Sequence, residues 1–269
     1  MKIKFLIGNF DMIPIIRTQE ELFSSTVINT YNKYKKEEAN LVITNANFYD
    51  LTSAGKIDAF NGHDPVPASE TTALGYVIKN NKLLTGKAAP LDFYIAYYKK
   101  EQYKINSSKI FDCYRSGQGN PPLNCSSAFG GLGPLIINGL LYGNSNLYTK
   151  NAPKEAPKVG DPGQYRKYLN QRNSAKYSAF ERKDIDSNHT LGKTCIGINE
   201  DGIYIISQEE GDTNGMSIQR IRNYLYKNKC KHALFFDGSD SSLFFEKGSF
   251  VVKQGENKDE TCTVGILFK

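Results

Sequence analysis

The chain has 269 residues, of which 39% are hydrophobic and 23% charged, so it can bury a core as one large domain or two small ones. Its formal net charge of +6 is a mild bias towards anionic partners. The lysines are spread along the chain with acidic residues between them, so the chain has no basic block of the kind found in a nucleic-acid-binding arm. No apolar run reaches the roughly 18 residues that a membrane-spanning helix needs.

The N-terminus predicts a first strand rather than a targeting segment. Residues 1–8 combine two lysines with a short apolar run, and Asn9 and Asp11 end that run too early for a secretory signal. The expected location is therefore the cytoplasm, or outside the cell by a route that needs no signal.

A helix is expected at about 18–38. Thr18 followed by Glu21 has the spacing of a capping box, and aromatic and apolar residues then recur at helical spacing. The apolar residues 41–43 predict a buried strand that runs into the polar sequence NANFYD, residues 45–50. Polar residues at the end of a strand are a usual place for a binding site, although an Asn-rich turn would have the same composition.

The middle of the chain alternates between predicted strands and long loops. Strands are expected at about 73–79 and 91–99, with loops at 51–72 and 112–127. Cys113 and Cys125 bracket the second loop, which contains glycines and two prolines, so we expect them to lie close enough for a disulfide. The absence of a CxxC pair argues against a zinc site.

Two further segments differ in kind from their surroundings. Residues 129–139 are a Gly-rich lead into an apolar strand and a turn, and no GK[ST] follows to make a phosphate loop. Residues 149–190 contain few large aliphatic residues and are expected to form a polar insertion with a short helix near 163–171. The insertion is interpreted either as a basic lid over an anionic substrate or as a solvated excursion.

The last third of the chain predicts strands at 194–198, 203–207 and 261–268, and a helix capped by Ser217 that ends near residue 228. A strand at 233–236 is followed by the polar turn DGSDSS, residues 237–242, and by apolar residues 243–245. The turn holds two carboxylates, three hydroxyls and several backbone N–H groups. It could bind a phosphate, a sugar or a metal, or it could be a tight surface hairpin.

Many strands and two helices in no regular βαβ alternation indicate an α+β fold. We expect a single domain of residues 1–269, with a mainly antiparallel or mixed sheet, helices packed against it and a polar insertion at about 149–190.

Five stretches in this order resemble the phosphodiester glycosidases: NANFYD, GGLGPLIINGL, GKTCIGINEDGIYII, GMSIQRIRNYL and ALFFDGSDSSLFF. The family pattern is NGGFFD, GPLLV-x-DG, RTAIGI-x-x-DG, G-x-TL-x-ELA and LDGGGSS. The resemblance covers about 41–50, 129–140 and 192–245. Members of the family remove N-acetylglucosamine from a phosphodiester, and bacterial members are often described as exopolysaccharide-related.

The resemblance implies a set of site residues. Asp237 would be the nucleophile or base, with Asp50 or Asp240 as the second carboxylate. Sugar hydroxyls or the phosphate would be bound by the following residues: Asn45, Asn47, Lys193, Gly238, Ser241 and Ser242. We also expect Asp237 to pair with Lys193 on a neighbouring strand. The chain departs from the family pattern where Ser239 and Asp240 replace glycines and Lys193 replaces an arginine.

The resemblance therefore implies a hydrolase that cleaves the glycosidic bond to phosphate in a sugar-phosphodiester substrate. The alternatives are a binding module that sequesters a phosphorylated sugar or nucleotide without turnover, and a cell-surface structural protein with no small ligand. No cofactor and no metal are expected, although calcium or magnesium would be compatible with the carboxylates. The sequence does not specify the sugar, the group attached to the phosphate or the oligomeric state.

Overall fold

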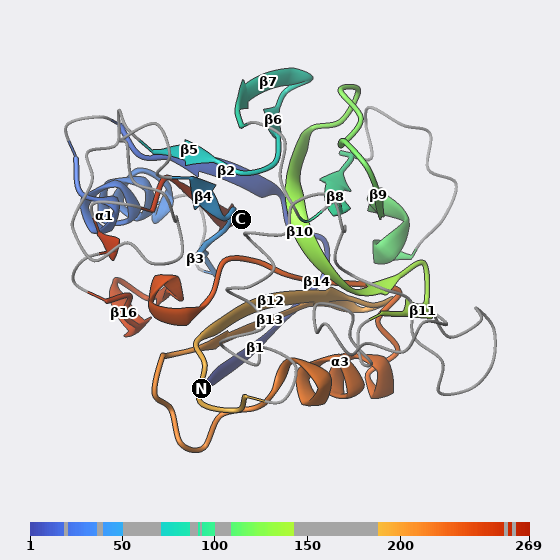
Figure 1. Cartoon of the computed structure of the whole chain (residues 1–269). Helices are drawn as coiled ribbons and strands as arrows, with labels where there is room; N and C mark the ends of the chain where they lie inside the picture. Colours follow the sequence, from blue (N-terminus) through green and yellow to red (C-terminus); the bar gives the residue numbers. More distant parts are fainter. Residues whose placement is uncertain are drawn as a thin grey trace.

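Two large antiparallel sheets and two α-helices make up most of the described chain (Figure 1). The computed structural model describes residues 1–18, 21–36, 40–50, 71–86, 91, 93–99, 109–142, 188–255, 258–259 and 262–269. Residues 51–70 of the predicted loop 51–72, residues 149–187 of the predicted insertion 149–190 and the short helix predicted within it lie outside these residues.

The larger sheet has ten strands, and its main order is β1-β13-β12-β14-β10-β6-β7. Its members are β1 (Lys2–Ile7), β6 (Val77–Lys79), β7 (Lys82–Thr85), β8 (Phe93–Tyr97), β9 (Tyr114–Gln118), β10 (Ser127–Ile137), β11 (Leu140–Leu141), β12 (Lys193–Ile198), β13 (Gly202–Gln208) and β14 (His232–Phe235). The smaller sheet has the order β16-β15-β3-β17-β2. Its members are β2 (Met12–Ile16), β3 (Val42–Asn45), β15 (Phe244–Glu246), β16 (Ser249–Val252) and β17 (Val264–Phe268). A separate short pair joins β4 (Tyr49–Asp50) to β5 (Thr72–Ala73).

Helix α3 (Ile218–Lys227) packs against the larger sheet, and its start was predicted correctly. The hydroxyl of Ser217 accepts a hydrogen bond from the Arg220 backbone N–H at 3.3 Å, which caps the helix. A Cβ on Gly197 of β12 would lie 2.6 Å from Leu225, so the absence of a side chain there lets the helix approach the strand. The apolar face of α3 joins the main core cluster.

Helix α1 (Phe23–Tyr34) packs on the smaller sheet and is shorter than the predicted 18–38. The predicted capping box at Thr18 and Glu21 does not cap it, because the helix begins four residues later than the box requires. Its first N–H groups are bound instead by Asp259, whose carboxylate accepts from the Ser24 N–H at 2.5 Å. A cap contributed by a residue so distant in sequence leaves no local signal.

Strand β10 differs from its prediction, since its glycines lie inside the strand rather than in a lead into it. The strand pairs with β6 and β8 through its first half and with β14 through its second half. Gly131 has φ +67, and the pairing with β8 shifts register between Phe129 and Leu132. A Cβ on Gly133 would lie 1.9 Å from the ring of Phe235. The glycines therefore permit the bend and the close packing of one long strand.

The predicted bridge between Cys113 and Cys125 is not formed, and both thiols are free and buried. Strand β8 pairs with β9, which follows Cys113, and with β10, which follows Cys125. Strands β9 and β10 lie on either side of β8, so two strand spacings of about 4.8 Å separate them. This separation exceeds the Cα–Cα distance of roughly 7 Å over which a disulfide can form. The bracketed segment was predicted to be loop throughout, whereas residues 114–118 form β9.

The turn after β14 is not the connection of a hairpin. Strand β14 pairs with β10 and β12 in the larger sheet, whereas β15 pairs with β3 and β16 in the smaller one. Residues 237–242 therefore carry the chain from one sheet to the other. Lys2 and Lys4 of β1 also link the sheets by forming ion pairs with Glu246 of β15.

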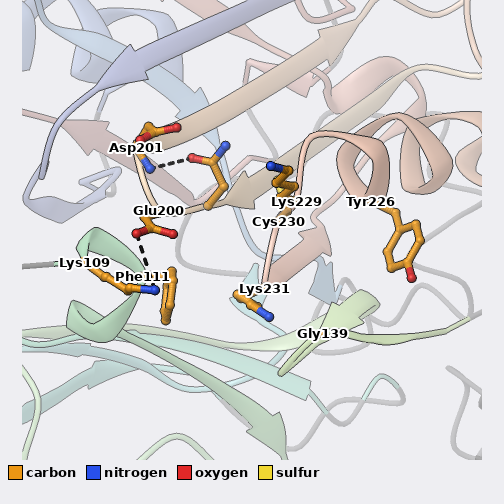
Figure 2. A pocket seen from close by; sticks show the side chains of 10 residues that line it. Lys109, Phe111, Gly139, Glu200, Asp201, Tyr226, Lys229, Cys230 and Lys231 are labelled. Carbon is orange, nitrogen blue, oxygen red and sulfur yellow. Dashed lines mark hydrogen bonds and ion pairs between the residues drawn. The ribbon is translucent and has the colours of Figure 1, made fainter. Parts of the chain in front are cut away.

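A cavity of about 640 Å³ lies beside the end of β12 and the start of β14, away from the turn at residues 237–242 (Figure 2). Among the described residues, no helix has both the length and the apolar character that crossing a membrane requires.

His232, the first residue of β14, should make the stability of the folded protein sensitive to acid. Burial, together with the positive charges of Arg115 and Lys231, lowers its pKa from 6.5 to about 4, against an opposing effect of Asp112. Between pH 6.5 and 4 the unfolded chain binds a proton that the folded chain refuses, so folding stability falls as the pH falls. We expect His232→Asn, which keeps an acceptor for Ser116, to lose about 2 kcal/mol less stability across this window.

Urea denaturation at pH 7 and at pH 4.5 measures this difference. His189→Asn is the matched control because His189 is exposed. Equal pH dependence in the wild type and in His232→Asn would contradict the prediction.

Candidate functional site

The segment that ends β3 and the segment that follows β14 lie against each other where the two sheets meet. We call residues 45–47 and 237–242 together the sheet junction. The Asp237 N–H donates to the Ala46 carbonyl at 2.9 Å, and the Asn45 side-chain amide donates to the Asp237 carbonyl at 2.8 Å. These contacts place residues 45–47 of the NANFYD motif against the start of the DGSDSS motif. The backbone of Asp50 lies in β4, but its side chain is outside the described part of the chain.

Asn45 is occupied by contacts within the protein. Its amide oxygen accepts from the Thr194 hydroxyl at 2.6 Å and from the Leu243 N–H at 3.0 Å. With its bond to Asp237, this side chain connects β3 and β12 to the segment between β14 and β15. The structure therefore gives Asn45 a positioning role, which sequence analysis did not anticipate.

Asn47 is different because one end of its amide has no partner. The nitrogen donates to the carbonyls of Leu74 and Gly130, at 3.1 and 2.8 Å, and lies 3.3 Å from that of Gly75. The amide oxygen is buried and accepts no hydrogen bond from the described residues. Since buried polar atoms are nearly always satisfied, this oxygen is a candidate acceptor for a ligand hydroxyl or a water.

Asp237 lies at the centre of the sheet junction and is buried, with one carboxylate oxygen accepting from the Gly238 N–H at 2.9 Å. Its negative charge reaches three other ionisable groups. Burial and then Asp237 raise the pKa of Tyr49 to about 12, and the same two causes raise the pKa of the Cys262 thiol. Asp237 also helps to raise the pKa of Lys258.

Lys258 is the cation of this site, and sequence analysis missed it. Its side chain is 7% exposed, its ammonium lies 3.8 Å from an Asp240 carboxylate oxygen, and it forms a hydrogen bond with Tyr49. Burial acts to lower the pKa of Lys258, but Tyr49, Asp240 and Asp237 outweigh it and raise the pKa. Lys258 therefore stays charged between the two carboxylates of the turn.

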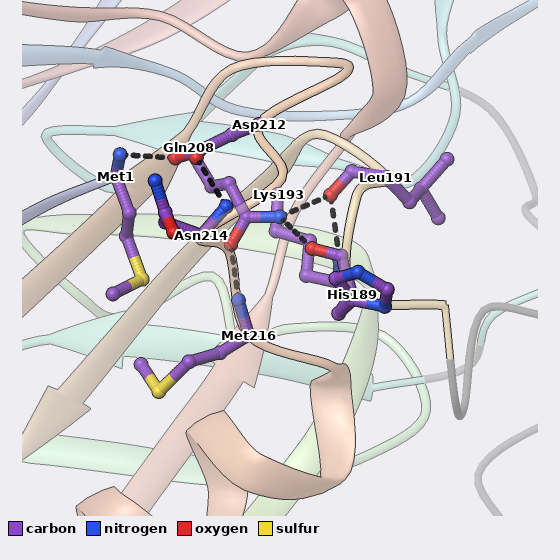
Figure 3. A network of polar contacts seen from close by, with 8 residues as sticks. All are labelled: Met1, His189, Leu191, Lys193, Gln208, Asp212, Asn214 and Met216. Carbon is purple, nitrogen blue, oxygen red and sulfur yellow. Dashed lines mark hydrogen bonds and ion pairs between the residues drawn. The ribbon is translucent and has the colours of Figure 1, made fainter.

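Lys193 does not make the predicted contact. It lies on β12 beside β14, as expected, but its ammonium donates to the Leu191 carbonyl at 2.5 Å (Figure 3) and to the Asn188 carbonyl at 2.9 Å, and not to Asp237. Burial lowers its pKa to about 8, against the effects of Cys195 and Glu210. The predicted pairing with Asp237 is wrong, because Lys193 is only 2% exposed and its ammonium is satisfied locally by backbone carbonyls.

Gln208 shares this arrangement with Lys193. Its side-chain nitrogen donates to the carbonyls of His189 and Leu191, and its oxygen accepts from the Met216 N–H at 2.7 Å (Figure 3). The two side chains thus hold the segment that leads into β12 against the segment that leads into α3. Their contacts indicate a structural role.

The two predicted serines of the turn are both buried but differ in their contacts. The Ser241 hydroxyl forms a hydrogen bond with the Cys262 thiol. The Ser242 hydroxyl has no partner among the described residues, so it resembles the Asn47 oxygen in being available to a ligand. Ser239 keeps the left-handed backbone, with φ +55, that a glycine would favour at this position.

Gly192 and Gly238 let the turn approach β12. The Ser239 N–H donates to the Gly192 carbonyl at 2.7 Å, and a Cβ on Gly192 would lie 1.9 Å from the Ser239 carbonyl oxygen. We expect Gly192→Ala to displace residues 237–242, to lower stability by about 2 kcal/mol and to abolish any activity of Asp237.

Thermal unfolding and turnover of Gly192→Ala test this expectation together. Gly8→Ala, where a Cβ would meet nothing within 4 Å, should change only stability. A Gly192→Ala protein with the stability and turnover of the wild type would contradict the displacement.

The described residues contain no group of three or more His, Cys, Asp or Glu side chains arranged to hold a metal ion. The junction and two side chains next to it, Tyr49 and Lys258, supply a buried carboxylate, a buried lysine and a phenol. They also supply two side-chain atoms, of Asn47 and Ser242, that have no hydrogen-bond partner among the described residues. Such a set can bind a polar ligand that carries both an anionic group and hydroxyl groups.

Comparison with known proteins places the fold in a class. The sequence matches no family model and no curated protein. The chain has an α+β fold. This fold is similar to that of the catalytic domain of zebrafish N-acetylglucosamine-1-phosphodiester alpha-N-acetylglucosaminidase, which was solved in a form auto-inhibited by its pro-peptide. The TM-score is 0.52 with 12% identity, over 100% of this chain and 88% of the other. A hypothetical protein from Synechocystis is similar with a TM-score of 0.44 and 10% identity, over 97% of this chain and 57% of that one. At 12% identity, the similarity to the zebrafish domain supports a distant relationship of fold only.

Proposed function

We propose that the protein is a hydrolase that cleaves the glycosidic bond to phosphate in a sugar-phosphodiester substrate. The observation that carries this proposal is the buried Asp237 carboxylate held near a buried ammonium, Lys258, at the sheet junction. The junction belongs to a fold similar to that of a phosphodiester alpha-N-acetylglucosaminidase, which supports the choice of reaction.

The reaction breaks the bond between the sugar anomeric carbon and the phosphate oxygen. The phosphate leaves with the bonding electron pair as a phosphomonoester, and water supplies the hydroxyl of the released sugar. Because phosphate is a good leaving group, the main requirement is to stabilise positive charge on the sugar and negative charge on the phosphate.

The charged and hydrogen-bonding groups at and next to the junction have proposed roles in this reaction. Asp237 acts as the nucleophile or as the base that activates water, with Asp240 or Asp50 as the second carboxylate. Lys258 binds the phosphate in the role that sequence analysis gave to Lys193. The following groups bind sugar hydroxyls or phosphate oxygens: Asn47, Ser242 and the backbone around Gly238.

A screen for released phosphomonoester tests the proposal. The substrates are N-acetylglucosamine 1-phosphodiesters that carry a methyl, a sugar or a nucleoside group on the phosphate, and ³¹P NMR detects the product. Release by the wild type but not by Asp237→Asn supports the assignment. No release above that of Asp237→Asn from any of the three substrates would overturn it.

A binding module without turnover is the second candidate. It is favoured by the burial of Lys193 where the family pattern has arginine, and by Ser239 in a left-handed conformation where that pattern has glycine. Calorimetric binding of the same substrates without release of phosphomonoester would favour this candidate over the hydrolase.

A further inference from the structure

We propose a second ligand site, for a phosphorylated monosaccharide, in the cavity at the end of the larger sheet opposite to the sheet junction. The cavity has a volume of about 640 Å³, within the usual range for small-ligand sites. Strand β12 runs from Lys193 at the junction to Ile198 beside the cavity, and its six residues put the two sites about 17 Å apart. The cavity is thus separate from the proposed active site.

The walls of the cavity are turns that are hydrogen-bonded to one another. The Lys231 N–H donates to the Ile198 carbonyl, and the Lys231 carbonyl accepts from the Gly139 N–H, both at 2.8 Å. The Asn199 side chain donates to the Asn228 carbonyl at 3.0 Å and accepts from the N–H groups that follow it, at 2.9 and 3.0 Å. The site is therefore preformed, which lowers the entropic cost of binding.

Lysines supply the phosphate-binding groups. Lys229 and Lys231 have no carboxylate partner among the described residues, whereas Lys109 pairs with Glu200 at 3.4 Å. The Lys231 side chain extends over Gly139, where a Cβ would lie 4.0 Å from its ammonium. Figure 2 shows Lys231 between Phe111 and Tyr226, with Lys109 beyond Phe111.

Lys229 also occupies an unfavourable backbone position. It follows α3 with φ +59, a left-handed conformation that glycine usually supplies after a helix. Its N–H donates to the Tyr226 carbonyl at 2.9 Å, so the local structure holds this conformation and orients the side chain. The end of the helix therefore fixes the backbone from which the Lys229 side chain extends at the wall of the cavity.

The other lining groups favour a sugar phosphate over a simple anion. Glu200 and Asp201 would repel a bare polyanion, but their carboxylates accept hydrogen bonds from hydroxyl groups. Phe111 and the half-exposed Tyr226 offer apolar ring surface to the face of a sugar. A single phosphate with several hydroxyls on one ring satisfies both sets of groups.

Amide-resolved NMR titration of the full chain with glucose 6-phosphate tests the proposal, with glucose and inorganic phosphate as separate arms. We expect the backbone signals of Gly139, Lys229 and Lys231 to shift with glucose 6-phosphate. The same shifts should require at least about a threefold higher concentration of glucose alone or of inorganic phosphate alone. Lys231→Gln should weaken binding about fivefold, whereas Lys82→Gln, an exposed lysine on β7, should not.

The proposal would be overturned by the absence of shifts at about 20 mM glucose 6-phosphate, a concentration far above the dissociation constants of specific small-ligand sites. Shifts confined to the sheet junction, or equal weakening of binding by Lys231→Gln and Lys82→Gln, would also overturn it. Because Asp237 does not line this cavity, Asp237→Asn should bind glucose 6-phosphate here like the wild type. This site and the proposed hydrolase activity can therefore fail independently.

Discussion

Replacing Asp237 with asparagine is expected to lower turnover of a sugar phosphodiester at least about a hundredfold while the protein stays folded. Asparagine keeps the oxygen that accepts from the Gly238 N–H, and the backbone contacts of Asp237 with Asn45 and Ala46 do not involve its side chain. What the substitution removes is the negative charge. Lys258 keeps Asp240 as a partner, so the ammonium is not left without a carboxylate.

Turnover and melting temperature are measured on the same preparation of the Asp237→Asn protein. Glu209→Gln is the matched control, since it removes one negative charge from an exposed side chain. A rate within a few fold of the wild type would eliminate Asp237 as the catalytic carboxylate. If Asp237→Asn melts far below the wild type, Asp237→Glu, which keeps the charge but moves it, gives a second test: its rate should also fall, and an unchanged rate would contradict the assignment.

The fold was predictable wherever one strand or helix had its own apolar pattern. The strands at Val42, Ile196 and Ile266 and the helix capped by Ser217 follow from local composition alone. Strand β2 contains Pro14, which argues against a central strand but is tolerated because β2 lies at the edge of the smaller sheet. Strand β9 is too polar for its sequence to separate it from a loop.

The candidate site was predictable only in part. The two motifs around Asn45 and Asp237 were found because each is a polar segment at the end of an apolar strand. Lys258 was not found, because it lies in a polar run with no periodicity and reaches the site through tertiary structure. Lys193 was assigned wrongly because strand adjacency predicts neither the direction of a long side chain nor the carbonyls available to it.

Replacing Lys258 with glutamine is expected to reduce kcat/KM about thirtyfold, because a charge-assisted contact to phosphate and the charge balance around Asp237 are lost together. Lys253→Gln is the matched control from the same polar segment, since Lys253 is exposed, and it should leave kcat/KM unchanged. Lys258→Arg keeps the positive charge and should retain a larger share of the activity than Lys258→Gln does. Wild-type kcat/KM in Lys258→Gln would contradict the assignment of phosphate binding to Lys258.

The stability of these variants separates electrostatic pairing from general damage. Lys258→Gln removes a cation that interacts electrostatically with the buried Asp237, and removal of one member of a buried pair costs about 3 kcal/mol. In the double variant that also carries Asp237→Asn, this cost should largely disappear, so the two substitutions should not add. Urea denaturation of the four proteins measures the coupling. Additive losses would show that Asp237 and Lys258 do not stabilise each other, and would contradict the electrostatic pairing of these two side chains.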